Sequence, residues 1–144
     1  TDYHGFKKSI QPLLKDHHKK ALILGTGGAS KAIAYALRKL KIEYDFVSRT
    51  ADEFQYKYEE LDASIFEEYT IIINTTPVGT HPNVDDCPNL DYSLFTKKHI
   101  AYDLIYNPEE TAFLRKAKAQ GAVTKNGYEM LVLQAEKAWK IWNE

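Results

Sequence analysis

The sequence has one cysteine, seven glycines, five prolines and almost no net charge among its 144 residues. A single cysteine excludes an internal disulfide, as expected in a reducing cytoplasm. A formal charge of −1, with no large basic patch, argues against nucleic acid as a partner. No apolar run is long enough to cross a membrane, and no signal peptide is visible. We therefore expect a cytoplasmic protein that binds neither nucleic acid nor a membrane.

A glycine-rich turn is the most informative feature that is present. The apolar run Ala21–Leu24 ends in Gly25-Thr26-Gly27-Gly28-Ala29, and a helix-forming run follows. Glycine lets the backbone approach a ligand closely, and the free N–H groups at the start of a helix attract anions. The turn therefore predicts a pyrophosphate site for a dinucleotide. A purely structural turn is the alternative, because Ser30 departs from the full three-glycine fingerprint.

Short apolar strands alternate with helices along the chain. The patterns predict helices over 3–15, 28–40, 62–69, 109–120 and from about 127 to the end, and strands over 20–25, 44–48, 54–58, 70–74, 100–104 and 122–124. Few residues separate the second and third strands, so their crossover must be reduced to a turn. This order predicts a Rossmann-like α/β fold over residues 1–144, with three layers, α/β/α, around a mostly parallel six-stranded sheet. Ligands of such sheets bind at the carboxyl ends of the strands.

The end of the second strand distinguishes between two cofactors. NAD-binding proteins place Asp or Glu here, whereas this chain has Ser48-Arg49-Thr50. Arginine suits a phosphate dianion, and the two hydroxyls can add neutral hydrogen bonds. We therefore predict NADP rather than NAD. Asp52 and Glu53 oppose phosphate binding, and a solvated surface arginine is the structural alternative.

A second polar segment, Asn74 to Thr80, follows the fourth strand. Thr75 and Thr76 offer hydroxyl and N–H groups at the same sheet edge, where they can line a nicotinamide–ribose pocket. A polar turn stabilised by Pro77 and Gly79 explains the composition equally well. The loop over 77–90 is long for a compact domain, and such loops are often functional.

In order and spacing, these motifs resemble the C-terminal, NADP-binding part of shikimate dehydrogenase. The resemblance also includes Tyr102 to Pro108, Gly127-x-x-Met130-Leu131-x-x-Gln134-Ala135 and the opening residues Thr1 to Phe6. It covers the chain from residue 1, and the family's N-terminal substrate domain, with its catalytic lysine, is missing. The chain departs from the family at Ser48, Glu53 and Thr80.

The resemblance implies a role for each matched residue. Asp2 would bind the substrate hydroxyl and pair with the catalytic lysine, and Tyr106 and Gln134 would contact shikimate. Leu104 and Gly127 would contact the nicotinamide, and the glycine turn would bind the pyrophosphate. The 2′-phosphate end would be bound by Ser48, Arg49 and Thr50. The implied reaction is reversible hydride transfer between NADPH and 3-dehydroshikimate, in chorismate and aromatic amino-acid biosynthesis.

Ordinary structural roles are the alternative for the substrate-facing residues. Asp2 is then a helix N-cap, Tyr106 a packing tyrosine and Gln134 a solvated helix residue. Two other functions also stay open: an NAD-dependent quinate/shikimate dehydrogenase, and a nucleotide-binding module without chemistry of its own. We expect the isolated chain to bind NADP(H) and to turn over shikimate poorly or not at all.

Overall fold

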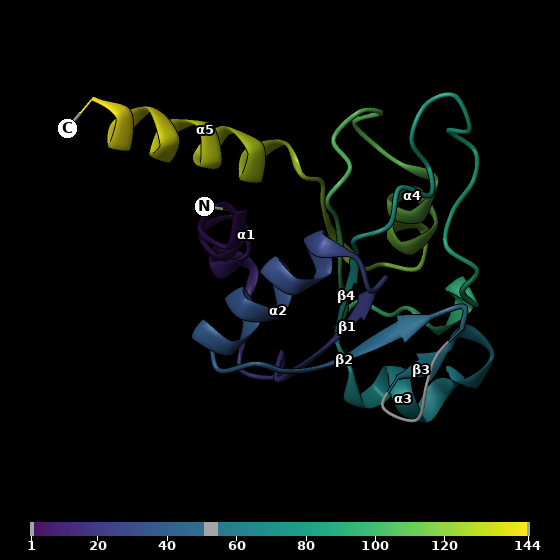
Figure 1. The fold of residues 1–144 in the computed structure, drawn as a ribbon. Helices are drawn as coiled ribbons and strands as arrows, with labels where there is room; N and C mark the ends of the chain where they lie inside the picture. The colour runs from purple at the N-terminus through teal and green to yellow at the C-terminus, as the bar shows by residue number, and fades with distance from the viewer. Residues whose placement is uncertain (1, 51–54, 144) are drawn as a thin grey trace.

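The computed structural model describes residues 2–50 and 55–143, with only the backbone for Asp2. Its one sheet has six strands, all parallel, in the order β3-β2-β1-β4-β5-β6 (Figure 1). The strands are β1 (Lys20–Leu24), β2 (Glu43–Ser48), β3 (Tyr56–Lys57), β4 (Ile71–Asn74), β5 (Ile100–Asp103) and β6 (Val123–Lys125). The order reverses between β1 and β4, which confirms the predicted Rossmann-like α/β fold.

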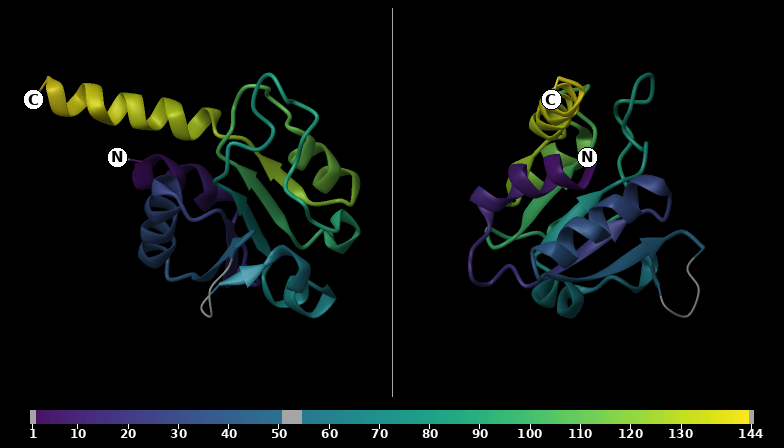
Figure 2. Two further views of the ribbon diagram at one scale, coloured as in Figure 1. Left: turned by 45° about the vertical axis from the view of Figure 1, so that its right-hand side comes forward. Right: turned by 60° about the vertical axis from the view of Figure 1, so that its left-hand side comes forward.

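Helices cover both faces of this sheet. They are α1 (Asp2–Ile10), α2 (Gly28–Lys39), α3 (Ala63–Glu68), α4 (Ala112–Ala119) and α5 (Tyr128–Trp142), with 3-10 turns η1 (Gln11–Leu13), η2 (Tyr58–Glu60) and η3 (Tyr92–Leu94). Figure 2 shows α1 and α2 on one face and α3 and α4 on the other.

Alternate residues of each central strand enter opposite halves of the core. Ala21 and Ile23 of β1 pack beneath α1 and α2, whereas Leu22 and Leu24 pack beneath α3 and α4. The isoleucines of β4 alternate in the same way. This period of two is the pleat of a strand that is buried on both faces.

The predicted elements differ from the structure mainly in length. The first helix ends at Ile10 rather than at residue 15, and η1 follows it, with Pro12 near its start. The third strand has only two residues, and Tyr58 lies in η2 instead. The connection from β2 to β3 spans residues 49–55, which is shorter than the dozen or more residues of a usual parallel crossover.

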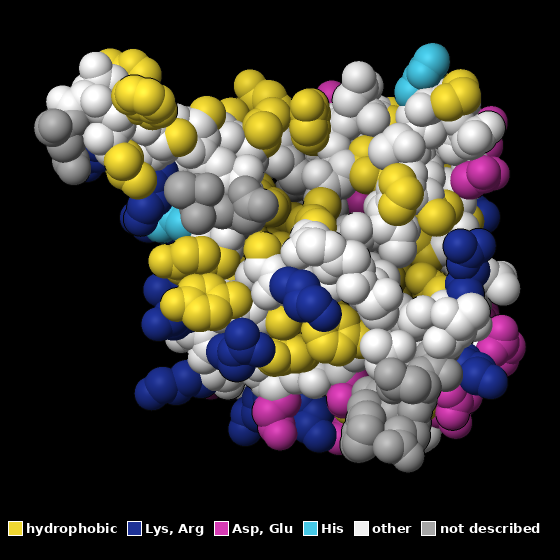
Figure 3. Space-filling view, viewed as in Figure 1, with side chains coloured by type: hydrophobic (Ala, Val, Ile, Leu, Met, Phe, Trp, Pro, Cys, Tyr) yellow, Lys and Arg dark blue, Asp and Glu magenta, His cyan; other side chains and the backbone are white. Residues whose placement is uncertain are grey.

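The helices α1 and α5 cross closely at Gly5. A Cβ at this position would meet the Met130 carbonyl oxygen and would lie 2.9 Å from Cγ of Gln134. Beyond this crossing α5 projects past the rest of the molecule, and its tip carries exposed hydrophobic side chains (Figures 2 and 3). Trp139 is 68% exposed and Trp142 is 87% exposed. No helix in the described parts of the chain is long and apolar enough to cross a membrane.

The amino-terminal edge of the sheet is held by two buried histidines, His18 and His99. Nδ1 of each ring accepts a hydrogen bond from the backbone N–H three residues earlier, at 2.9 Å from Lys15 and 3.0 Å from Thr96. Nε2 of each ring lies 2.9 Å from the Lys98 carbonyl oxygen and 2.7 Å from that of Phe66, respectively. This arrangement needs a neutral imidazole, and burial lowers the pKa of both rings.

We expect acid to destabilise the fold through these two rings. Because their folded pKa lies below the unfolded value of about 6.5, their contribution to stability is complete above that pH. It is lost as the pH falls below 6.5 towards the folded pKa. Urea unfolding between pH 7.5 and 5 should therefore show a steeper loss of stability in the wild type than in His99→Gln. Equal slopes in the two proteins would exclude this role for His99.

We expect Gly5→Ala to destabilise the protein by about 1–3 kcal/mol, because the added methyl group meets rigid backbone of α5. Gly28→Ala is the matched control, since a Cβ at Gly28 meets no atom within 4 Å. Thermal and urea unfolding of both variants measure the difference. A neutral Gly5→Ala would show that α5 moves freely relative to α1.

Candidate functional site

A pocket of about 660 Å³ opens at the carboxyl ends of β1, β2 and β4. The loops that follow these three strands form its walls, together with η2 and residues 87–89. Its lining consists of Gly25, Thr26, Gly27, Val47, Ser48, Arg49, Tyr58, Glu59, Thr75, Thr76, Pro77, Val78, Cys87, Pro88 and Asn89. Seven of the predicted cofactor residues therefore meet in one cavity at the edge where doubly wound sheets bind ligands.

The glycine turn packs against the loop after β4. Gly25 has a φ of +109°, and a Cβ there would lie 2.8 Å from Oγ1 of Thr75 and 3.0 Å from Cγ2 of Thr76. The Thr75 hydroxyl donates to the Leu24 carbonyl at 2.6 Å and so holds the two loops together. Only glycine combines this backbone conformation with this close approach.

The next two glycines face open space instead. A Cβ at Gly27 or Gly28 would meet no atom within 4 Å. Gly27 is the N-cap of α2, its residue type offers no capping side chain, and the first turn of α2 has no acidic residue. Ala29 lies exposed in this turn, while Ser30, at the third fingerprint position, is buried and donates to the Gly27 carbonyl at 2.6 Å. The N–H groups of Gly25 and Ser30 donate to the Val47 and Gly27 carbonyls, which leaves those of residues 26–29 for an anion.

Arg49 places a positive charge in the same pocket. It is exposed and, within the residues that the structure describes, it forms no ion pair. The Thr50 N–H donates to the Ser48 hydroxyl at 3.3 Å, which closes the turn after β2. Tyr58 stands close enough for the arginine to act on it: burial raises the pKa of its phenol, and the Arg49 charge opposes this shift. Asp52 and Glu53 lie outside the described residues.

The side chain of Asn74 organises the loop after β4. Its Oδ1 accepts from the Thr76 N–H at 3.0 Å and from the Thr76 hydroxyl at 2.7 Å. The same hydroxyl accepts from the Val78 N–H at 3.2 Å. On its other side, Nδ2 of Asn74 donates to Asp103 at 3.2 Å. A fully buried amide therefore fixes Thr76, a pocket residue, to the end of β5.

The remaining predicted residues lie at neighbouring strand ends. Leu104 and Gly127 are in contact, because a Cβ on Gly127 would collide with the Leu104 carbonyl. Tyr106 is 47% exposed on the loop after β5. Gln134 is half-buried on α5 against Gly5. Asp2 begins α1, and its side chain lies outside the described part of the structure.

Sequence patterns had missed part of the pocket wall. Tyr58 and Glu59 line it from η2, where the sequence predicts only a strand. Cys87, Pro88 and Asn89 line it from the loop over 77–90. The unusual length of that loop was the available signal, although it did not identify which of its residues face the pocket.

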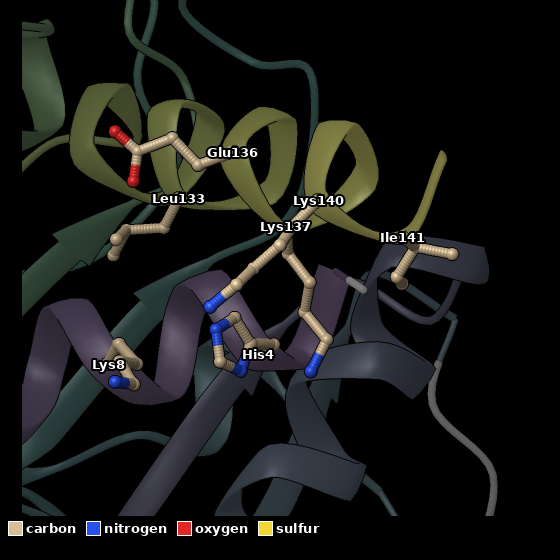
Figure 4. Close-up of a pocket in the computed structure, with 7 residues that line it drawn as sticks. All are labelled: His4, Lys8, Leu133, Glu136, Lys137, Lys140 and Ile141. Carbon is tan, nitrogen blue, oxygen red and sulfur yellow. The ribbon is translucent and has the colours of Figure 1, made fainter. Parts of the chain in front are cut away.

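A second cavity, of about 450 Å³, lies between α1 and α5 (Figure 4). Figure 4 shows His4 rising from α1 towards Lys137 and Lys140, which descend from α5. The pKa of His4 is lowered by burial first and then by the charges of Lys137 and Lys8. None of the predicted site residues lines this cavity, and no described cluster of His, Cys, Asp or Glu could hold a metal ion.

The chain is similar in sequence to NADP-dependent shikimate dehydrogenases. The shikimate dehydrogenase (NADP(+)) of Pelagibacter ubique is 38% identical over 152 residues, which are all of this chain and 57% of that protein. That of Caldanaerobacter subterraneus is 39% identical over 160 residues, with 99% of this chain and 56% of that protein covered. No protein-family model matches the chain.

Solved structures agree with the sequence comparison. Shikimate 5-dehydrogenase from Thermus thermophilus, solved with NADP(H) and shikimate, superposes with a TM-score of 0.80 at 33% identity over 98% of this chain and 55% of that one. The chain spans about half the length of the curated relatives it matches. By sequence and by fold, the chain is therefore similar to shikimate dehydrogenases over a little more than half the length of such a protein.

Proposed function

We propose that this chain is the NADP(H)-binding domain of a cytoplasmic shikimate dehydrogenase. The observation that carries the proposal is one pocket at the switch point of the sheet, between β1 and β4, in which the glycine turn, Arg49 and the Thr75–Thr76 segment converge. The names of the relatives and the NADP(H) complex of the Thermus neighbour support this choice of cofactor.

The pocket and the residues beside it would together hold a dinucleotide phosphate. Gly27 and Gly28 leave open space above the first turn of α2. A pyrophosphate there would accept hydrogen bonds from backbone N–H groups. Arg49, at the end of β2, would bind the 2′-phosphate with paired N–H donors. Thr75 and Thr76 continue the wall towards Leu104, where the nicotinamide would lie against the Leu104–Gly127 contact.

The proposed substrate lies beside this pocket. When bound, the nicotinamide supplies or accepts the hydride that interconverts 3-dehydroshikimate and shikimate. Asp2 would accept a hydrogen bond from the substrate hydroxyl and pair with a lysine, and Tyr106 and Gln134 would contact the substrate. That lysine and the groups that bind the substrate carboxylate would come from the N-terminal substrate domain of the family, which this chain does not include.

We expect the 144-residue chain to bind NADPH and not to reduce 3-dehydroshikimate at a measurable rate. Fluorescence titration measures the binding, and NADPH absorbance follows the reaction. The parent protein with its substrate domain is the positive control for turnover. Absence of saturable binding at millimolar NADPH would refute the cofactor domain, whereas turnover by this chain alone would refute the proposed division of the site.

We expect Arg49→Ala to weaken NADPH binding about tenfold to a hundredfold and to leave NADH binding nearly unchanged. The loss corresponds to one charge-assisted pair, worth roughly 1.5–3 kcal/mol. Calorimetric titration with both cofactors gives the comparison. Arg115→Ala is the matched control, because Arg115 is exposed on α4 and lines none of the described pockets.

Equal losses for the two cofactors would show that Arg49 does not bind the phosphate. Tighter binding of NADH than of NADPH by the wild type would instead favour an NAD-dependent quinate or shikimate dehydrogenase.

A further inference from the structure

Asp103 is a fully buried carboxylate at the carboxyl end of β5. It accepts three hydrogen bonds, all from neutral donors: from Asn74 at 3.2 Å, from the Ile105 N–H at 3.1 Å and from the Thr111 hydroxyl at 2.7 Å. No ion pair in the described parts of the chain includes it. Burial raises its pKa to about 6 despite these donors. At neutral pH the charge is thus held at a cost in stability.

The acceptor character of Asp103 dictates the orientation of Asn74. An ionised carboxylate can only accept, so the Asn74 amide must turn its NH₂ group towards Asp103. Its carbonyl oxygen then faces the opposite way, where it accepts both bonds from Thr76. A chain of hydrogen bonds therefore runs, from donor to acceptor, from the loop that walls the cofactor pocket through Asn74 to Asp103.

The same carboxylate also fixes the loop after β5. Its Oδ1 accepts from Ile105, directly after Leu104, and its Oδ2 accepts from Thr111, the N-cap of α4. The backbone N–H of Leu104 in turn donates to the backbone carbonyl of Asn74 at 3.1 Å. Both loops next to the nicotinamide end of the site are thus tied to one side chain.

We propose that Asp103 is a positioning residue of the cofactor site, which holds Thr76 and Leu104 in the geometry that binds the dinucleotide. This inference rests on the proposed cofactor site. The cost of the buried charge supports it, because a residue with a purely structural role would stabilise the fold more as a neutral amide. The charge of Asp103 also affects the phenol of Tyr92 in η3. Burial raises the pKa of Tyr92 first, followed by Cys87 and then Asp103.

The first test separates binding from stability. Asp103→Asn keeps the shape and removes the charge, so at pH 8 its melting temperature should be no lower than that of the wild type. Its NADP⁺ affinity should fall about fivefold to tenfold, because hydrogen bonds to a neutral amide oxygen are weaker than those to a carboxylate and hold Asn74 less firmly. Unchanged affinity, or a loss of affinity together with a lower melting temperature, would overturn the inference.

The second test places a second carboxylate beside Asp103. Asn74→Asp sets two carboxylates against each other, so one must be protonated for the loop to keep its conformation. Relative to the wild type at the same pH, this variant should bind NADP⁺ about tenfold more weakly at pH 9 and nearly normally at pH 6.

Ser9→Ala is the matched control, because it removes a buried hydroxyl that bonds Tyr102, the neighbour of Asp103, at 2.5 Å on the other face of β5. It should lower the melting temperature and leave the NADP⁺ affinity unchanged. If Asn74→Asp binds NADP⁺ equally well at pH 6 and at pH 9 relative to the wild type, the positioning role fails while the cofactor site stands. If the wild type does not bind NADP⁺ at all, the inference and the proposed function fail together.

Discussion

The hydrogen bonds of the Asp103 carboxylate determine how the carboxyl edge of the sheet is arranged. Parallel strands end side by side at this edge, but the loops that leave them have no regular backbone pairing of their own. One buried acceptor ties two of these loops together through Asn74 and Thr111. The pocket wall at Thr76 and the turn at Leu104 therefore have positions fixed relative to each other before any ligand arrives, which lowers the cost of ordering them on binding.

The two edges of the sheet hold their neighbouring loops with side chains of different charge. At the amino edge, His18 and His99 bind backbone groups in their neutral form, so no charge is buried there at neutral pH. At the carboxyl edge, Asp103 is charged at neutral pH and surrounded by neutral donors. A buried charge, which costs stability, thus lies at the carboxyl edge beside the proposed site and not with the two histidines.

Sequence patterns were sufficient for the layers, the six strands and the pocket edge, because period-two burial and strand–helix alternation are local signals. They were insufficient where tertiary contacts decide. Tyr58 alternates with polar residues as in a strand, yet it turns into η2 and lines the pocket. Asp103 appears in the sequence only as one residue of a matched motif. Its importance depends on Asn74 and Thr111, which lie 29 and 8 residues away along the chain.

The glycines show most clearly what a motif can and cannot predict. Gly25 is required by its positive φ and by the contact with Thr75, and Gly127 by the Leu104 carbonyl, so both serve packing within the protein. A Cβ at Gly27, in contrast, would meet no atom within 4 Å, so no contact among the described residues requires glycine there. The proposed phosphate site therefore involves only part of the turn. A sequence pattern gives every glycine the same letter, and only the surrounding atoms separate those that close the fold from those that leave room for a cofactor.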